Sequence, residues 1–261
     1  MKLSYVTVLS SDNYLPGVLA LDINVREKCS YPLLVVTPKD LLAQTYAELE
    51  CRNISYIQSD DIPAPAEALR ATTEHAWYRH WVKSLFKLRI YDLIEYEKIV
   101  FIDCDMMLLE SIDGAFDYPD GSAVVAGAEY PGNAHWVDLN SGFMVITPKA
   151  GLSADITALI PDVAQKKPIF GDQDLIQAFF FDWKHNNALH MPGGYNVYFD
   201  HYQFYKYIGN IKTVHFIGNK KPWMMGFFAR CKVYLKCLLK KNIKGIPIFI
   251  AYRKLLREAS R

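Results

Sequence analysis

Residues 98–105 read Lys-Ile-Val-Phe-Ile-Asp-Cys-Asp, and this stretch decides the fold class of the chain. Its first five residues form an apolar, β-branched run, which is typical of a strand buried in a parallel sheet. Asp103 and Asp105 follow directly. Positions i and i+2 at a strand end project to the same side, so the two carboxylates could converge on one cation. Acids that simply end a strand in solvent give the same pattern, and Asp-x-Asp alone does not separate the two interpretations.

Outward from this stretch, apolar strands alternate with amphipathic helices. Strands are predicted at 3–9, 32–37, 54–57, 98–102, 123–127 and 142–147, and helices at about 16–27, 39–50, 81–96, 151–165 and 172–183. Residues 58–73 are rich in Asp, Pro, Ala and Thr and predict a long loop. The alternation predicts an α/β fold with a mostly parallel sheet, which binds ligands beyond the carboxyl ends of its strands.

Composition narrows the class of protein. The chain has 261 residues, of which 51% are hydrophobic, enough for a substantial core. Its net charge of +1 gives no general field for nucleic acid, so no nucleic-acid partner is expected. Five cysteines without a Cys-x-x-Cys pair indicate reduced thiols in a cytoplasmic setting. No signal peptide is visible, and no apolar run approaches the ~18–20 residues that span a bilayer.

Two common nucleotide-binding signatures are absent from the sequence. No G-x-G-x-x-G follows the first strand, and no G-x-x-x-x-G-K-[ST] occurs anywhere. The sequence therefore disfavours a dinucleotide oxidoreductase and a P-loop NTPase.

A second candidate segment is His215–Trp223, which reads His-Phe-Ile-Gly-Asn-Lys-Lys-Pro-Trp. His215 follows an apolar pair and could be a core histidine. Gly218, however, permits close backbone approach to a ligand, and Lys221 offers a mobile charge suited to phosphate. Two carboxylates with one imidazole suit Mn²⁺ better than Mg²⁺, although Mg²⁺ stays possible. A cation, a glycine and a lysine together describe a diphosphate site.

Two further segments have both a structural and a functional interpretation. Gly171-Asp172-Gln173-Asp174 opens the predicted helix 172–183, where an aspartate can cap the helix without any catalytic role. Asn140-Ser141-Gly142 can be a turn before a strand.

Taken in order, these segments resemble the glycogenin-like family 8 retaining glycosyltransferases over about residues 3–223. The resemblance rests on five blocks: Val6–Leu19, Lys87, Phe101–Asp105, Leu139–Gly142 with Gly171–Gln173, and His215–Trp223. It implies a GT-A fold, in which one Rossmann-like nucleotide-binding domain over 1–223 binds a UDP-sugar through Mn²⁺. It also implies transfer of a hexose from that donor to a saccharide acceptor, with retained configuration.

The resemblance assigns roles residue by residue. The metal ligands would be Asp103, Asp105 and His215. The uridine would be held by Val8, Ser10, Ser11 and Tyr14, with Cys104 also counted among the nucleotide contacts, and the ribose or donor sugar by Lys87, Asn140 and Ser141. Gly218 and Lys221 would contact the diphosphate, and Asp172 and Gln173 would face the anomeric carbon. Asp174 stands where the family often has a small residue, and residues 129–138 do not align. Sugar specificity therefore stays open, and no tyrosine can be assigned as a self-glucosylation acceptor.

Two other classes of function remain as alternatives. A haloacid-dehalogenase-type phosphatase also places Asp-x-Asp after an apolar strand. Here the pair comes about a hundred residues into the chain, and Met107 stands where that motif usually has Thr or Val. A non-catalytic sugar-nucleotide-binding protein would keep the same metal and phosphate positions.

The last segment, 224–261, differs in charge from the rest. It holds ten Lys/Arg and one acid, whereas residues 1–223 hold 19 basic and 27 acidic residues. Apolar and basic residues interleave at helical spacing, which predicts a basic amphipathic tail lying on an anionic membrane surface. A peripheral enzyme on the inner face of a membrane would then act on a glycolipid acceptor in polysaccharide synthesis. The alternative is a C-terminal helix that packs on the acidic body.

Overall fold

The computed structural model describes residues 2–126, 137–205 and 210–261. The strands are β1 Leu3–Val8, β2 Leu33–Pro38, β3 Ser55–Ser59, β4 Lys98–Ile102, β5 Met106–Leu108, β6 Ala123–Val125, β7 Leu139–Ile146, β8 His190–Met191, β9 Val197–Tyr198 and β10 Thr213–His215. The helices are α1 Leu15–Lys28, α2 Ala43–Cys51, α3 Ala66–Glu74, α4 Trp81–Ser84, α5 Leu152–Thr157, α6 Ile160–Lys166, α7 Asp172–Phe179, α8 Tyr202–Tyr205, α9 Phe227–Leu239 and α10 Gly245–Glu258.

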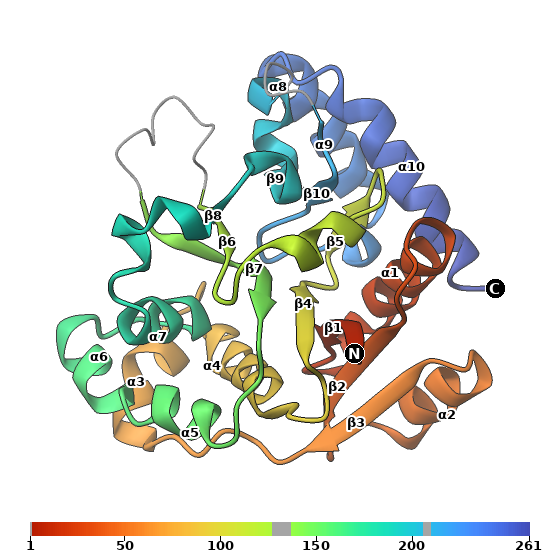
Figure 1. Cartoon of the computed structure of the whole chain (residues 1–261). Helices are drawn as coiled ribbons and strands as arrows, with labels where there is room; N and C mark the ends of the chain where they lie inside the picture. The colour runs from red at the N-terminus through yellow and green to blue at the C-terminus, as the bar shows by residue number, and fades with distance from the viewer. Residues whose placement is uncertain (1, 127–136, 206–209) are drawn as a thin grey trace.

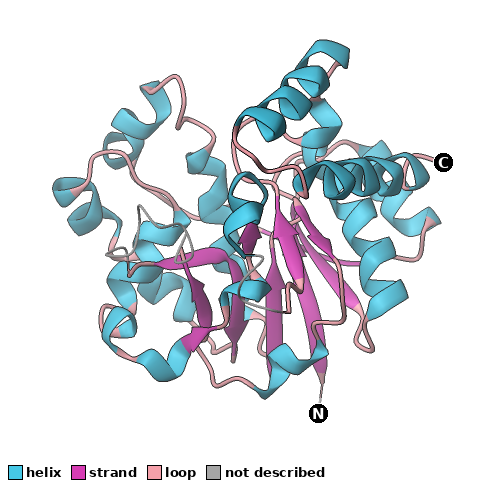
Figure 2. Ribbon diagram, turned by 90° about the horizontal axis from the view of Figure 1, so that it is seen from above, coloured by secondary structure: helices cyan, strands magenta, loops and turns pink. Residues whose placement is uncertain are grey.

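A seven-stranded sheet in the order β3-β2-β1-β4-β7-β6-β8 forms the centre (Figure 1). Strands β3, β2, β1 and β4 run parallel, β7 is antiparallel to both β4 and β6, and β8 is parallel to β6. Helices cover both faces (Figure 2), so β1, β2 and β4 are mostly buried, as the sequence predicts, whereas the edge strand β3 is partly exposed. The predicted mixed, mostly parallel sheet is confirmed.

A second, three-stranded sheet has the order β5-β10-β9 and was not predicted. Strand β10 runs antiparallel to β5, and this register sets His215 opposite Met106. On the other side β10 runs parallel to β9, with His215 opposite Tyr198. The small sheet therefore carries His215 to the turn that follows β4.

Two hydrophobic cores lie on opposite faces of the large sheet. One contains side chains of α1 and α10, together with the small sheet. The other contains residues 85–93 and side chains of α6 and α7. The chain between β4 and β5 emerges at the carboxyl edge of the parallel strands, where the sequence predicts ligands to bind.

Several predicted elements differ from those observed. Helix α3 begins inside the predicted loop 58–73 and ends at Glu74. The predicted helix 81–96 is the short α4 followed by a 3₁₀ segment, Leu85–Asp92. The predicted helix 151–165 is divided into α5 and α6, with Pro161 in the first turn of α6. Most of the unaligned segment 129–138 falls outside the described residues.

The tail is helical, as predicted, but its two helices are buried to very different degrees. Helix α10 packs along α1 and contributes Phe249, Tyr252, Leu255 and Leu256 to the core (Figure 1). In α9, only Cys237 is buried to this extent. Within the described part of the chain, no helix has the length and apolar character needed to cross a membrane.

Candidate active site

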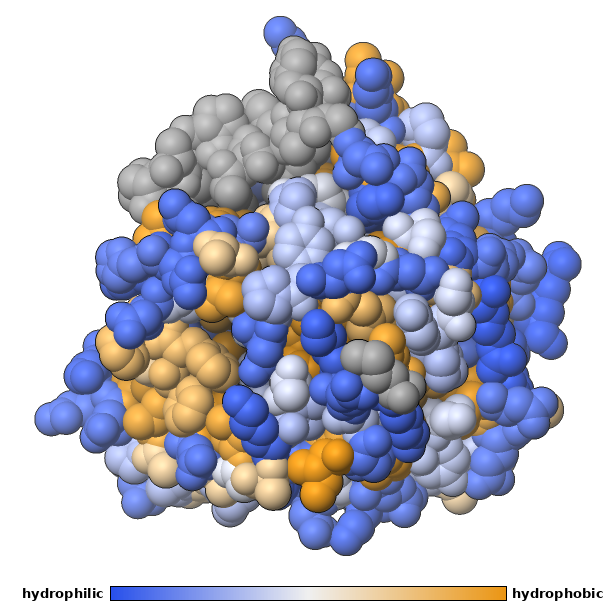
Figure 3. Space-filling view, in the orientation of Figure 1, coloured by the Kyte–Doolittle hydropathy of each residue, from blue (hydrophilic) through white to orange (hydrophobic). Residues whose placement is uncertain are grey.

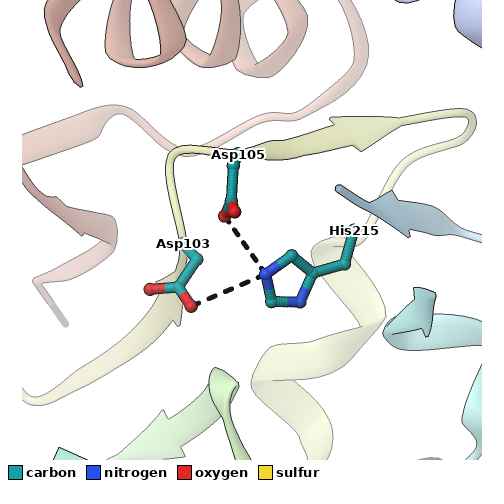
Figure 4. A group of neighbouring side chains, drawn as sticks. All are labelled: Asp103, Asp105 and His215. Carbon is teal, nitrogen blue, oxygen red and sulfur yellow. Dashed lines mark ion pairs between the residues drawn. The ribbon is translucent and has the colours of Figure 1, made fainter. Parts of the chain in front are cut away.

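Asp103, Asp105 and His215 converge at the carboxyl edge of the sheet, where β4, β5 and β10 meet (Figure 4). The imidazole Nε2 of His215 lies 3.1 Å from Asp105 Oδ1 and 3.8 Å from Asp103 Oδ2. One ligand atom from each residue lies within 4.8 Å of the others. Two carboxylate oxygens and one imidazole nitrogen at this spacing fit a divalent cation.

Asn196 orients the imidazole of His215. Its side-chain nitrogen donates to Asn140 Oδ1, so its amide oxygen faces His215 Nδ1 at 2.9 Å. An amide oxygen only accepts, and the network therefore places the proton on Nδ1. Nε2 is left to face the carboxylates, and a hydrogen bond on the other ring nitrogen commonly orients a metal-binding histidine in this way. Asn196 is 1% exposed, and the sequence analysis did not identify it.

Gly142 has no side chain, which makes room for His215, Asn140 and Asp103 to meet. A Cβ added there would lie 2.6 Å from His215 Cε1, 2.8 Å from Asn140 Oδ1 and 2.9 Å from Asp103 Oδ2. The Gly142 carbonyl also accepts the backbone N–H of Asp103 at 2.9 Å. Gly142 is therefore needed for this geometry, a role that the turn interpretation of 140–142 missed.

Lys87 joins the metal-ligand pair to the segment that opens α7. Its Nζ lies 3.1 Å from Asp103 Oδ1 and 2.9 Å from Asp172 Oδ2, and it donates to the Ser141 hydroxyl at 3.2 Å. Burial favours the neutral amine, but the two carboxylates outweigh it and raise the pKa of Lys87 above its usual range. The ammonium stays charged between two acids.

Asp172 points into the site and does not cap its helix. Its Oδ2 accepts from the Ser141 hydroxyl at 2.7 Å and pairs with Lys87. Asp174 accepts the Gly171 N–H at 2.9 Å, so the capping role belongs to Asp174. Burial would raise the pKa of Asp172, but the Lys87 ammonium and the hydrogen bonds hold it below its usual value.

Gln173 lies beside the same strand. Its Oε1 faces both the side-chain nitrogen of Asn140 and the backbone N–H of Ser141, each at 3.3 Å. The hydroxyl of Tyr198 accepts a further hydrogen bond from Asn140 at 2.8 Å. The structure thus brings together the three segments around 140, 172 and 196.

Lys221 lies against Asp105, forming an ion pair with its Oδ2. Both groups are buried. Burial would raise the pKa of Asp105, but Lys221 and His215 hold it far below its usual range. Burial instead raises the pKa of Asp103, and the adjacent Asp105 charge adds to this against the pull of Lys87. The two metal-ligand candidates therefore differ in proton affinity.

The segment after β1 is tied to the segment after β10. Trp223 Nε1 donates to the Asn13 carbonyl at 2.8 Å, and its ring meets the edge of Tyr14 at 6.0 Å between centroids. A Cβ on Gly17 would lie 2.5 Å from the Trp223 ring and 2.8 Å from the Cys104 carbonyl. Tyr14 is therefore held beside the site, half-buried.

The remaining predicted contacts lie along the same edge. Val8 is the last residue of β1, and Ser10 and Ser11 follow it, half-buried. Gly218 has φ +105°, a conformation that favours glycine, and no atom lies within 4 Å of a Cβ built there. The backbone at Gly218 is thus open to close approach.

A mixed α/β sheet with an Asp-x-Asp pair and a histidine at its carboxyl edge fits a glycosyltransferase of the GT-A type. Residues 6–225 match the model of glycosyl transferase family 8, and the chain belongs to that family. This family match favours a glycosyltransferase over the haloacid-dehalogenase-type phosphatase.

Relatives of known name agree with this. The chain is 29% identical over 239 residues to glycogenin-1 of Oryctolagus cuniculus, covering 88% of this chain and 68% of that protein. It is 28% identical over 237 residues to glycogenin of Neurospora crassa, covering 85% of this chain and 31% of that protein. The chain thus spans about a third to two thirds of the length of the curated relatives that it matches.

A solved structure shows the same fold. The galactosyltransferase LgtC, in complex with donor and acceptor sugar analogs, superposes with a TM-score of 0.60 at 14% identity. The match covers 90% of this chain and 95% of that one. The GT-A fold expected from the sequence is confirmed.

Proposed function

We propose that this protein is a retaining glycosyltransferase that moves a hexose from a UDP-sugar to a saccharide acceptor with the help of Mn²⁺. The observation that carries the proposal is the convergence of Asp103, Asp105 and His215 in a chain of glycosyl transferase family 8. Mg²⁺ is the alternative ion. The mixed oxygen and nitrogen donor set favours Mn²⁺.

These three residues would hold the cation, which when bound supplies Lewis-acid stabilisation of the departing diphosphate. Lys221 would have a second role, as a diphosphate contact. Its ammonium now neutralises Asp105, and a cation on that carboxylate would free Lys221 to donate to a phosphate oxygen. Gly218, with no neighbour close to its Cβ position, would let the backbone approach the same diphosphate.

The donor's remaining parts would lie along the strand ends. Val8, Ser10, Ser11 and Tyr14, with Cys104, would hold the uridine. Support comes from the place of the first three at the end of β1, which pairs with β4. Lys87, Asn140 and Ser141 would contact the ribose or the donor sugar. Support comes from their hydrogen-bonded arrangement around Asp103 and Asp172.

Asp172 and Gln173 would face the anomeric carbon. Positive charge develops on the sugar ring as the glycosidic bond breaks, and an ionised, buried carboxylate stabilises such charge strongly. Lys87 and Ser141 both bond to Asp172 Oδ2, which lowers the nucleophilicity of that oxygen. An electrostatic role for Asp172 therefore fits the geometry better than a covalent one.

The test is a donor panel with the purified full chain and Mn²⁺. UDP release is measured for each UDP-sugar, and the anomeric configuration of product is read by proton NMR. Release with a retained α-anomer supports the proposal. A thermal shift with UDP but no turnover on any donor and acceptor would indicate a sugar-nucleotide-binding protein instead, and p-nitrophenyl phosphate hydrolysis would revive a phosphatase.

We further propose that α9 lies on an anionic membrane and that the acceptor is a glycolipid. Phe228, Leu235 and Leu239 follow one line along the helix and are 80%, 56% and 75% exposed. The side chains of Lys232 and Lys236 are exposed beside them. Figure 3 shows apolar next to polar side chains at the top of the molecule, over the end of this helix. Such a face suits the lipid interface.

In this proposal residues 1–223 carry the transfer chemistry and 224–261 attach the enzyme to the inner face of a membrane. Removing the whole tail is not a usable test, because α10 belongs to the core. The variant is instead F228S/L235S/L239S. Its control, L42S/I94S/F181S, removes three residues that are 53%, 62% and 67% exposed elsewhere.

Both variants are co-sedimented with phosphatidylglycerol and with phosphatidylcholine vesicles. We expect wild type and control to pellet with the anionic vesicles in a salt-sensitive way, since each cation near an anionic leaflet contributes ~1 kcal/mol. The α9 variant should stay in solution. Equal pelleting of the two variants would exclude α9 as the contact.

A further inference from the structure

Helix α10 packs against the segment that carries His215, although it lies beyond residue 225, where the match to the family ends. The ring of Tyr252 stacks on Phe216, with centroids 4.4 Å apart and planes at 8°. Phe216 is the residue after His215. The last helix of the chain is therefore in direct contact with the segment that carries a metal-ligand candidate.

Phe216 also joins two of the three candidate ligands through its backbone. Its N–H donates to the carbonyl of Asp105 at 3.0 Å. That N–H belongs to the peptide group formed with His215. A rotation of this peptide would lengthen the hydrogen bond to Asp105 and turn the imidazole of His215 at the same time.

The ring of Phe216 makes two stacked contacts. Phe199 lies 4.9 Å from it at 25°, and Tyr252 lies 4.4 Å from it at 8°. Tyr252 is fully buried, and Phe216 is 4% exposed. In a close-packed core, a ring with these neighbours has little room to move.

The hydroxyl of Tyr252 distinguishes this contact from ordinary packing. It is buried without a hydrogen-bond partner among the described residues. Burial raises the pKa of Tyr252, and the nearby charge of Asp105 adds to the effect, which places the hydroxyl in the field of that carboxylate. The ring and the hydroxyl can therefore be separated experimentally.

We infer that Tyr252 is a positioning residue for the metal site. Its ring fixes Phe216, and through the backbone of Phe216 it fixes Asp105 and His215 relative to each other. The inference rests on the proposed function only in taking these side chains as ligands of a divalent cation. Residues outside the family match would then set the affinity of the site for its metal.

The test measures Mn²⁺ binding to the full chain by the loss of the free-ion EPR signal, without donor or turnover. Y252L removes the ring, whereas Y252F keeps the ring and removes the hydroxyl. The control is F116L, which removes another buried ring of the same core, 7% exposed and in tilted contact with Tyr5 at 5.1 Å between centroids. Circular dichroism confirms that each variant is folded at the assay temperature.

We expect Y252L to bind Mn²⁺ at least tenfold more weakly than wild type, which is the range for loss of a second-shell support. Y252F should bind within a factor of three, and F116L should bind as wild type despite a lower Tm. If Y252L does not fold, F216L removes the other ring of the stack and takes its place in the comparison.

The failures of the two proposals are distinguishable. Wild type that binds no Mn²⁺ overturns the metal site itself and this inference with it. Wild type that binds, together with Y252L or F216L that bind equally well, overturns the positioning role alone. An equal loss in F116L would do the same, because it would show a general effect of core loosening.

Discussion

Gly142→Ala tests whether the packing around the metal-ligand candidates sets their function. The added Cβ would lie 2.6 Å from His215 Cε1 and 2.9 Å from Asp103 Oδ2, whereas ordinary contact begins at 3.4 Å. One or both side chains must therefore move by about half an ångström or more. His215 has little freedom to do so, because Asn196 holds its Nδ1 and it is 4% exposed.

The size of the effect follows from these contacts. Overpacking of a filled site costs about 1–3 kcal/mol of stability. A ligand moved from its place typically costs ~10–100-fold in metal affinity, as does the loss of a second-shell partner. Gly114→Ala is the matched control, because its Cβ would meet only Tyr195 Oη, at an ordinary 3.5 Å.

Two measurements read these effects separately. Thermal unfolding without metal gives the stability loss, and Mn²⁺ titration followed by EPR gives the affinity. We expect Gly142→Ala to lose both, and Gly114→Ala to lose neither. An alanine at 142 that binds Mn²⁺ as tightly as wild type would refute the view that this glycine makes room for the ligands.

Substitutions at three other residues extend the test. Asp103→Asn should reduce transfer more than tenfold, a loss above ~1.4 kcal/mol, and a variant that keeps over a tenth of the activity would contradict its role as a ligand. Asp172→Asn should lower kcat with little change in UDP affinity by calorimetry; a destabilised variant with unchanged kcat would make it structural. Asn196→Ala should weaken Mn²⁺ binding ~10–100-fold, whereas Asn196→Asp, which keeps an acceptor for His215 Nδ1, should bind more tightly than the alanine. Equal affinities in these two variants would contradict the tautomer assigned to His215.

The parts of the fold that the sequence predicts are those with an unbroken local signal. The apolar runs of β1, β2 and β4 are long enough to be recognised without their partners. The split of the predicted helix 151–165 has a local cause as well, because Pro161 cannot donate a hydrogen bond to residue 157. In the 3₁₀ segment 85–92, six of eight residues are buried, so the polar face that marks an amphipathic helix is missing.

Helix α3 was not predicted, because its local sequence signal is weak. Residues 66–74 contain good helix formers, but the surrounding Asp and Pro residues dominated the interpretation of 58–73 as a loop. Its half-buried Ala68 and Leu69 pack against the core beside α6. Tertiary packing of this kind stabilises a short helix that local propensity leaves undecided.

The residues of the candidate site also fall into those with a local sequence signal and those without one. Asp103, Asp105, His215, Lys87 and Asp172 stand in recognisable sequence blocks, and the structure brings all of them together. Asn196 and Tyr252 do not stand in any such block. Asn196 meets His215 only because the two-residue β9 pairs with the three-residue β10, and strands this short leave no periodicity to read.

The charges of the site would couple the binding of a divalent cation to the binding of a diphosphate. When all three are ionised, Asp103, Asp105 and Asp172 carry three negative charges, against two positive charges on Lys87 and Lys221. A diphosphate alone would therefore enter a buried region with a net charge of −1, which opposes it strongly at low dielectric. A divalent cation held by Asp103 and Asp105 would reverse that sign and would compete with Lys221 for Asp105. The cation that makes the site attractive to a diphosphate would thus also release the lysine proposed to bind it. The ion pair between Lys221 and Asp105 is, in this view, the resting form of the phosphate contact.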